Sequence, residues 1–154
     1  NRNDSSRSLP KAKRREIMKV RDIMTTRVES VKPTTVLRHA ARRMSEFNVG
    51  SMPVVDDNGK LLGIITDRDI SVYAIAMGHD PQSTEVQKVM TKDVITCIAD
   101  MDLADAAALM KNKHIRRLAV MDNDLLAGFL SVDDLARASY DLAGAVLEAA
   151  TPIH

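Results

Sequence analysis

The chain has 154 residues, of which 45% are hydrophobic, 28% are charged and 3% are aromatic, and its formal net charge is +1. This length suits one compact domain, or two small ones that share a core. No apolar run approaches the roughly 20 residues of a membrane-spanning helix, and no signal-peptide pattern is present, so a membrane protein or a secreted protein is not expected.

Residues 1–21 form a basic segment without apolar periodicity. They hold eight Lys or Arg and two Asp or Glu, a local charge of +6, which leaves −5 for the rest of the chain. This composition is typical of a solvated arm, so we expect residues 1–17 to be a flexible tail. Nucleic-acid contact through this tail stays an alternative. It is disfavoured because no aromatic or glycine-rich sequence accompanies the basic residues.

The rest of the chain contains an internal repeat. Val20-Arg-Asp-Ile-Met-Thr25 returns as Val86-Gln-Lys-Val-Met-Thr91, at an offset of 66 residues. The offset becomes 65 beyond a turn that is one residue shorter in the second copy, where Gly63 corresponds to Gly128. Order and spacing hold over about fifty residues, which predicts two copies of one structural unit.

Each copy should begin with a short strand and a helix. In the first copy we expect a strand near Val28–Val31 and a helix capped by Thr34. Apolar residues then recur at helical spacing and form one stripe. In the second copy Asp100 is the expected cap. The two stripes consist of Val36, Leu37, Ala40, Ala41, Met44 and Phe47, and of Leu103, Ala106, Ala107 and Met110.

Two strands and a second helix should follow. Met52–Val55 and Leu61–Thr66 are apolar runs of strand length. Asn58-Gly59 between them favours a tight hairpin turn, because both residues tolerate positive φ. A final helix is expected from about Asp67 to Met77, ending at Gly78.

The order β-α-β-β-α therefore occurs twice, which predicts an α+β (mixed α/β) fold. One unit of about sixty residues is marginal alone, so the two repeats should pack as a pseudo-twofold pair with a shared core. We place the first repeat at residues 18–80, the second at 81–140 and a helical tail at 141–154. Apolar residues of that tail, from Leu142 to Ala150, indicate a surface that needs a partner.

The strongest local motif is Gly-x-x-Thr/Ser-x-x-Asp, at Gly63–Asp69 and again at Gly128–Asp134. One interpretation is helix capping, in which the hydroxyl of Thr66 or Ser131 accepts a first-turn N–H and the Asp favours the positive helix end. The other is nucleotide binding, in which the helix start binds phosphate and the carboxylate accepts hydrogen bonds from ribose hydroxyls. From the residues alone, the two interpretations are equally supported.

These motifs resemble the CBS domain family. The Met-Thr opening, the Met52-Pro-Val-Val-Asp56 segment and the Gly-x-x-Thr-x-x-Asp motif fall in order over residues 18–137, with counterparts in the second copy. The chain looks like the small stand-alone bacterial proteins that hold a tandem pair, or Bateman module. The resemblance implies two clefts that bind an adenine nucleotide (AMP, ADP or ATP) or S-adenosylmethionine for regulation, and it implies a homodimer.

The resemblance also implies site residues. In the family the Ser or Thr of the motif contacts phosphate and the Asp contacts ribose. The start of the first strand lines the base or ribose, and the position before the second strand often carries a basic phosphate contact. Carried onto this sequence, the set is Thr25, Arg27, Val28, Ser51, Thr66, Arg68, Asp69, Thr91, Asp93, Val94, Arg116, Arg117, Ser131 and Asp134.

The second copy departs from the first in two ways. Ala119 replaces the equivalent of Pro53, and Asp133 stands where the first copy has Arg68. An acid beside the phosphate-binding position repels a triphosphate, although Arg116 and Arg117 offset it. We therefore expect two inequivalent sites, and whether one or both are occupied stays open.

Catalysis and metal binding are not expected. His39, His79, His114 and His154 lack metal-ligand spacing with one another or with Cys97. Cys97 fits a strand position better than a nucleophile, and a single cysteine fits a reducing cytoplasm. We therefore expect a cytoplasmic protein that is not an enzyme and has no catalytic cofactor. A pure assembly module without a ligand stays the main alternative.

Overall fold

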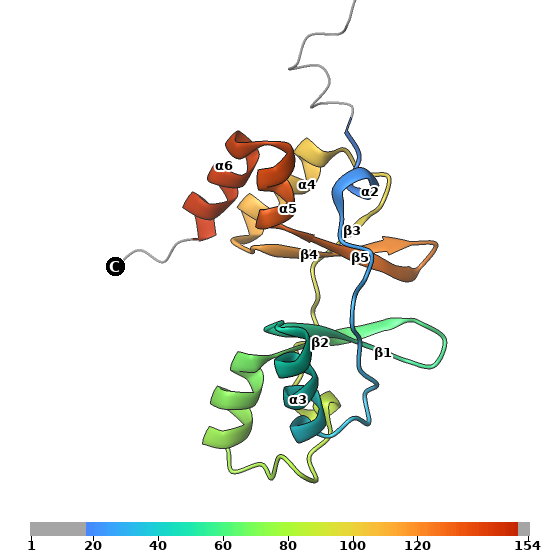
Figure 1. The fold of residues 1–154 in the computed structure, drawn as a ribbon, viewed down its shortest axis with the longest axis vertical. Coiled ribbons are helices and arrows are strands. Elements are labelled where there is room, and N and C mark those ends of the chain that lie inside the picture. Colours follow the sequence, from blue (N-terminus) through green and yellow to red (C-terminus); the bar gives the residue numbers. More distant parts are fainter. Residues whose placement is uncertain (1–17, 151–154) are drawn as a thin grey trace, which may run out of the picture. The chain divides into compact units, whose positions relative to one another are not determined.

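The structure, a computed structural model, describes residues 18–150 (Figure 1). Its helices and strands confirm the α+β class. In chain order they are α2 (Val20–Ile23), α3 (Leu37–Phe47), β1 (Ser51–Val55), β2 (Leu61–Thr66), the π-helix η1 (Asp69–Ala74), the 3-10 turn η2 (Val86–Lys88), β3 (Thr96–Ile98), α4 (Leu103–Lys113), β4 (Arg117–Asp122), β5 (Leu125–Ser131), α5 (Val132–Ala138) and α6 (Tyr140–Ala150).

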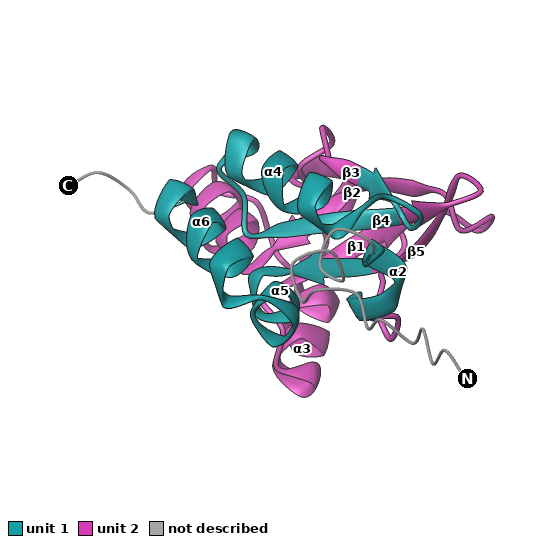
Figure 2. Ribbon diagram, turned by 90° about the horizontal axis from the view of Figure 1, so that it is seen from above, with its two compact units in different colours: residues 1–24, 97–120, 129–154 teal, residues 25–96, 121–128 magenta. Residues whose placement is uncertain are grey.

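The described residues group into two compact units, coloured separately in Figure 2. Unit 1 contains residues 18–24, 97–120 and 129–150, and unit 2 contains residues 25–96 and 121–128. The units do not follow the sequence repeats. Segment 18–24 belongs with the helices of the second repeat, and the tip of the β4–β5 hairpin belongs with the first repeat.

A two-stranded antiparallel sheet forms the centre of unit 2. β1 and β2 pair with Ser51 opposite Thr66, which confirms both predicted strands. Val31 adds a single parallel bridge to Val54, so the predicted strand at Val28–Val31 was wrong beyond this one residue. The chain leaves the sheet there because it turns at once at residues 32–35.

The turn between β1 and β2 is shaped by a carboxylate. Oδ1 of Asp56 accepts hydrogen bonds from the backbone N–H groups of Asn58 and Lys60, both at 2.9 Å. Gly59 has a φ of +81°, whereas Asn58 has no positive φ. The predicted hairpin is therefore present, but only its glycine uses the left-handed conformation.

The helix α3 begins two residues later than predicted. Its N-cap is Val36, not Thr34. The reason is long-range, because Val36 forms a bridge with Glu85, and the backbone N–H of Leu37 donates to the carbonyl of Thr84 at 2.9 Å. The loop at residues 81–85 thus satisfies first-turn N–H groups that a capping side chain would otherwise bind.

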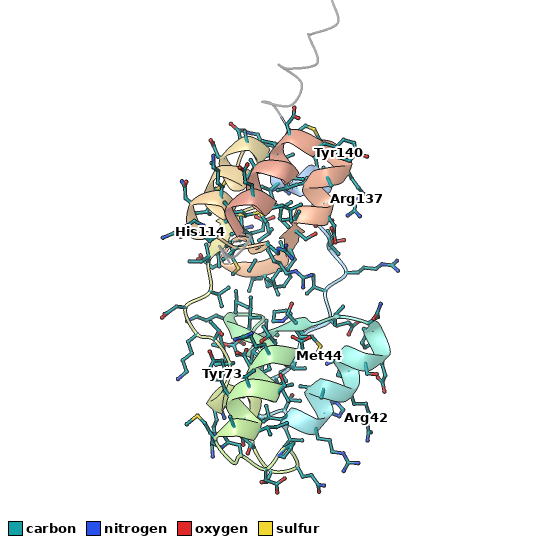
Figure 3. All side chains as sticks on the ribbon, turned by 90° about the vertical axis from the view of Figure 1, so that its left-hand side faces the viewer. Arg42, Met44, Tyr73, His114, Arg137 and Tyr140 are labelled. Carbon is teal, nitrogen blue, oxygen red and sulfur yellow. The ribbon has the colours of Figure 1, made fainter. Side chains whose placement is uncertain are left out.

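One face of α3 packs against the sheet of unit 2. Figure 3 shows Met44 on the inner side of the helix and Arg42 pointing away from it. The end of the predicted stripe was wrong, because Phe47 is 48% exposed. Phe47 is the last residue of the helix, and its ring lies 5.8 Å from the guanidinium of Arg43. The residues of α3 that are buried are Leu37, Ala40 and Met44.

The helical segment after β2 ends at Gly78, as predicted, with a φ of +74°. Its central part, Asp69–Ala74, is π-helical, a wider form than the predicted α-helix. In Figure 1 this segment and α3 lie on the same side of the β1–β2 sheet. The core of unit 2 contains Val31, Leu37, Ala40, Met44, Met52, Val54, Ile65, Ala74 and Val86.

Unit 1 joins the start of the described chain to the second repeat. Lys19 forms an antiparallel bridge with Asp102, and its Nζ lies 2.5 Å from Oδ1 of Asp102. Asp102 is the N-cap residue of α4, so the predicted cap at Asp100 was wrong. Asp100 instead accepts a hydrogen bond from Arg21.

Three helices cover the sheet of the second repeat, whose strand order is β3-β4-β5. α4, α5 and α6 lie on one side of it in Figure 1. The helix α6 occupies Tyr140–Ala150, and residues 151–154 of the predicted helical tail lie outside the described residues. No helix within residues 18–150 has the length and apolar character needed to cross a bilayer. Buried side chains of unit 1 include Leu103, Met110, Leu118, Leu130, Leu135 and Val146.

Candidate functional site

Two capping boxes stand at the carboxyl ends of β2 and β5. Oγ1 of Thr66 accepts a hydrogen bond from the backbone N–H of Asp69 at 2.9 Å, and Oδ2 of Asp69 accepts one from the N–H of Thr66 at 3.0 Å. Ser131 and Asp134 repeat this exchange at 3.2 and 2.9 Å. The capping interpretation is therefore confirmed, and one oxygen of each carboxylate is already used.

The two carboxylates differ in their second oxygen. Oδ1 of Asp134 accepts a hydrogen bond from the guanidinium of Arg137, whose side chain is 70% exposed. Val72 stands at the repeat-equivalent position of the first copy. Within residues 18–150, Oδ1 of Asp69 accepts no hydrogen bond. Asp69 therefore keeps an oxygen that can accept from a ligand hydroxyl, whereas both oxygens of Asp134 have partners.

The residue before each second strand lies beside its capping box. The backbone N–H of Asp67 donates to the carbonyl of Gly50 at 2.9 Å, and the N–H of Val132 donates to the carbonyl of Arg116 at 3.0 Å. The two hydrogen bonds join equivalent positions of the two repeats, since Asp67 corresponds to Val132 and Gly50 to Arg116. The predicted residue Arg116 is thus held next to the Ser131 box, where the first repeat has a glycine.

Two further predicted residues lie at the starts of strands. Ser51 opens β1 opposite Thr66, so its side chain belongs to the same end of the sheet as the first capping box. Arg117 opens β4, and its guanidinium lies 5.9 Å from the ring of Phe129. Ser51 and Arg117 therefore start the strands next to the two capping boxes, and their role in a binding site stays a prediction.

The predicted residue Arg68 and its counterpart Asp133 both lie on the surface. Each is the second residue after the motif hydroxyl, and both are exposed. The backbone N–H of Arg68 donates to Oδ1 of Asp67 at 2.8 Å. The two repeats thus present opposite charges at matching positions, as the sequence predicts.

A hollow of about 600 Å³ lies in unit 2. This volume falls inside the range of roughly 300–1,000 Å³ that is usual for small-molecule sites. Its first-repeat lining residues come from the β1–β2 turn and the start of β2: Asn58, Lys60, Leu61 and Leu62. Its second-repeat lining residues come from the segment before β3, from β3 and from the β4–β5 hairpin: Lys92, Val94, Thr96, Met121, Asp124 and Leu125. We call it the large hollow.

A second hollow of about 230 Å³ also lies in unit 2, and we call it the small hollow. Its lining residues from the first repeat precede β1, end β1 or follow it: Thr26, Val28, Ser30, Val55 and Gly59. Those from the second repeat belong to β5: Leu126, Ala127 and Gly128. No charged side chain of the described residues lines the small hollow.

The two hollows are repeat equivalents of each other. Val28 in the small hollow corresponds to Val94 in the large one at an offset of 66 residues. The same offset or the offset of 65 relates six further pairs, so the fold builds the same concavity twice. These pairs are Thr26 and Lys92, Ser30 and Thr96, Val55 and Met121, Gly59 and Asp124, Leu126 and Leu61, and Ala127 and Leu62.

Of the predicted first-strand residues, only Val28 and Val94 line a hollow. Thr25, Arg27, Thr91 and Asp93 are exposed beside them. Consecutive residues of an extended chain point to opposite sides, so only alternate residues can face one hollow. The residues that the sequence analysis missed here obey that rule: Thr26, Ser30, Lys92 and Thr96.

The backbone of Thr91 has a fixed place along β2. Its N–H and carbonyl exchange two hydrogen bonds with Ile64, both at 2.9 Å. A Cβ added at Gly63 would lie 2.6 Å from the carbonyl oxygen of Thr91, so glycine is required for this approach. The pairing holds the segment that carries Lys92 and Val94 against β2 and so forms one wall of the large hollow.

Within residues 18–150 no group of three or more His, Cys, Asp or Glu side chains could hold a metal ion. Cys97 lies in β3 and is buried, as the sequence predicts. Burial raises the pKa of its thiol to about 11, so the thiolate needed for nucleophilic attack is scarce at neutral pH.

Comparison with known proteins identifies the repeat. The sequence profile of the CBS domain matches residues 20–75 and 86–141. The CBS domain-containing protein YhcV of Bacillus subtilis is 41% identical over 130 residues, which cover 83% of this chain and 91% of YhcV.

Two solved CBS pairs have a similar fold. The CBS domain pair of MJ0100, in complex with 5′-methylthioadenosine and S-adenosyl-L-methionine, matches with a TM-score of 0.68 and 29% identity over 79% of this chain and 94% of that one. CBSX2 in complex with AMP matches with a TM-score of 0.69 and 30% identity over 80% and 97%. With its two profile matches, its duplicated capping box and its paired hollows, the chain belongs to the CBS domain family as a tandem pair.

Proposed function

We propose that the chain is a regulatory, non-catalytic module that binds an adenine nucleotide (AMP, ADP or ATP) or a related adenosyl compound. The observation that carries this proposal is the pair of repeat-equivalent hollows in unit 2, the larger of about 600 Å³. Similar CBS pairs have been solved with AMP and with S-adenosyl-L-methionine, which supports an adenosyl ligand.

Asp69 is the proposed ribose contact of the first repeat. Its carboxylate is buried, with 5% exposure, and Oδ1 accepts no hydrogen bond within residues 18–150. A carboxylate has several lone pairs, so it can accept from two vicinal hydroxyls while Oδ2 still caps the helix. Asp134 is the matching residue of the second repeat, where Arg137 competes for the same oxygen. Thr66 and Ser131 are proposed to approach the phosphate. None of these four residues lines the large or the small hollow, so their assignment rests on the capping boxes and the family resemblance.

Calorimetric titration with AMP tests this assignment. Asp69→Ala should weaken AMP binding about ten- to a hundredfold, because a lost hydrogen bond to a charged group costs about 1.5–3 kcal/mol. Glu46→Ala, which removes an exposed carboxylate from α3, should leave the affinity unchanged. Equal AMP affinity in the wild type and Asp69→Ala, together with a lower Tm for the variant, would reduce Asp69 to a capping residue.

Arg116 and Arg117 are the proposed phosphate contacts of the second repeat. The carbonyl of Arg116 is bonded beside the Ser131 box, and guanidinium groups bind phosphate oxygens well. Replacing either residue with Ala should weaken ATP binding more than adenosine binding. An unchanged ratio of the two affinities in both variants would remove these arginines from the site.

Self-association is part of the proposal. The helical segment after β2 exposes four apolar side chains, 39% to 72% accessible: Val72, Tyr73, Ile75 and Met77. Such a surface favours a partner, and a second copy of the chain is the simplest one. Sedimentation at micromolar concentration should report a homodimer. A monomer both with and without nucleotide would contradict this part of the proposal.

Nucleic-acid contact through the basic residues 1–21 remains the third hypothesis. Nearly all of that segment lies outside the described residues, so the structure adds no support to it. Binding of DNA or RNA that weakens steeply with salt would favour it.

A further inference from the structure

The two hollows share their shape-forming positions but differ in charge. Lys92 lines the large hollow where Thr26 lines the small one. Lys60 also lines the large hollow. Its repeat counterpart, Leu125, lines the large hollow too and is not among the residues of the small one. The same concavity thus carries two ammonium groups in one copy and no charged side chain in the other.

Neither lysine has a structural task that explains it. Within residues 18–150, no carboxylate pairs with the Nζ of Lys60 or of Lys92, whereas Lys32 in the same unit pairs with Asp57 at 3.3 Å. The fold does not require these charges, since threonine and leucine occupy the equivalent positions of the other repeat.

One acid lies in the same hollow. Asp124 lines it at a position with a φ of +63°, where the first repeat has Gly59 with a φ of +81°. Two lysines and one aspartate leave a net positive charge at the large hollow. Its other walls are mainly apolar: Leu61, Leu62, Val94, Met121 and Leu125. Apolar walls and a positive rim complement a flat base that carries an anionic group.

We propose that Lys60 and Lys92 make the large hollow selective for an anionic adenosine ligand, a nucleoside phosphate. It disfavours neutral adenosine and disfavours S-adenosylmethionine, whose sulfonium centre is cationic. This inference rests on the proposed function and adds to it the charge of the ligand and two lysines that attract that charge. The lysines line the large hollow, whereas the proposed phosphate contacts Thr66, Ser131, Arg116 and Arg117 do not, so the lysines act electrostatically and not as those contacts. The small hollow lacks charged walls and makes no such distinction.

Titration of AMP, adenosine and S-adenosylmethionine into the purified full chain tests the inference. The variants Lys92→Thr and Lys60→Leu install the residues of the other repeat. Each should weaken AMP binding roughly two- to fivefold, the size of an exposed charge interaction, and leave adenosine binding unchanged. Raising the salt concentration should weaken binding of AMP but not of adenosine.

Two controls separate a local effect from net charge. Asp124→Asn removes the opposing charge and should tighten AMP binding. Lys113→Thr removes an exposed lysine from α4, in unit 1, and should change nothing. Far-ultraviolet circular dichroism checks that each variant is folded.

The outcomes distinguish the inference from the proposed function. If the wild type binds none of the three compounds, the proposed function itself fails. If it binds adenosine and AMP equally, and neither lysine variant changes the ratio, only the charge selectivity fails. If the lysine variants weaken the binding of adenosine and of AMP by the same factor, the inference is also overturned. That result would mean that the lysines contribute to the shape of the hollow and do not attract the phosphate.

Discussion

Nε of Arg21 donates a hydrogen bond to Oδ1 of Asp100 at 2.7 Å, across 79 residues of sequence. The hydrogen bond and the charge of Arg21 lower the pKa of Asp100 below its usual value of 3.8. Both side chains are substantially exposed, at 42% and 71%, so the pair marks the contact between segment 18–24 and the second repeat without dominating the stability of the fold.

The pKa of Asp100 should rise toward its usual value in Arg21→Gln. Because the folded-state pKa is lowered, the pair stabilises the fold at pH values above 3.8, and this contribution disappears as the pH falls through the lowered pKa. Carboxyl chemical shifts followed by NMR from pH 6 to pH 2 measure the change. Arg42→Gln, on α3 in unit 2, is the control; an equal shift in both variants would contradict a specific pair.

Cys97 should resist thiol reagents in the folded protein. Burial raises its pKa to about 11, so at pH 8 the thiol is almost entirely protonated and also shielded. We expect the labelling rate with a disulfide reagent to increase at least tenfold in urea at the unfolding midpoint. Labelling of the native protein as fast as of a free thiol would show that β3 opens readily.

Gly63→Ala should destabilise the fold by about 1–3 kcal/mol, because the new Cβ would lie 2.6 Å from the carbonyl oxygen of Thr91 and 2.8 Å from Sδ of Met90. Gly144→Ala is the matched control. It lies in α6 with no atom within 4 Å of the added Cβ, so it should stabilise by up to about 1 kcal/mol. Urea unfolding measures both, and equal effects would rule out the close approach as the cause.

Asp134→Ala should cost more stability than Asp69→Ala. Both changes remove a capping box, worth about 0.5–2 kcal/mol. Asp134→Ala also removes the contact with Arg137. This adds only a few tenths of a kcal/mol to the loss in free energy of unfolding, because that guanidinium is mostly exposed. The double variant Asp134→Ala/Arg137→Val, compared with the two single variants, isolates the contact. If Asp69→Ala is the more damaging change, this account is wrong.

Local signals predicted the parts of the fold that depend on neighbours in sequence. The strands β1 and β2, the stop at Gly78 and both capping boxes follow from patterns within about ten residues. The caps at Thr34 and Asp100 were each misplaced by two residues, because Val36 bridges to Glu85 and Asp102 bridges to Lys19. Such partners lie far away along the chain and leave no local pattern.

The binding surfaces were predicted only in part for the same reason. Val28 and Val94 were identified from the family resemblance, but Lys60 was not. Lys60 lines the large hollow because the hairpin tip with Asp124, more than sixty residues later, belongs to the same unit. Lys92 could have been predicted, because alternate residues of an extended segment face the same side and Lys92 lies two residues before Val94.

The discontinuous make-up of unit 1 has a consequence for how the protein is made. Lys19 pairs with Asp102, which is synthesised 83 residues later. At a translation rate of about 5–20 residues per second, segment 18–24 waits about 4–17 s on the ribosome before its partner exists. Unit 1 therefore cannot fold during translation until the second repeat has been made. A gene fragment that begins after the first repeat would encode the second repeat without segment 18–24, which belongs to unit 1.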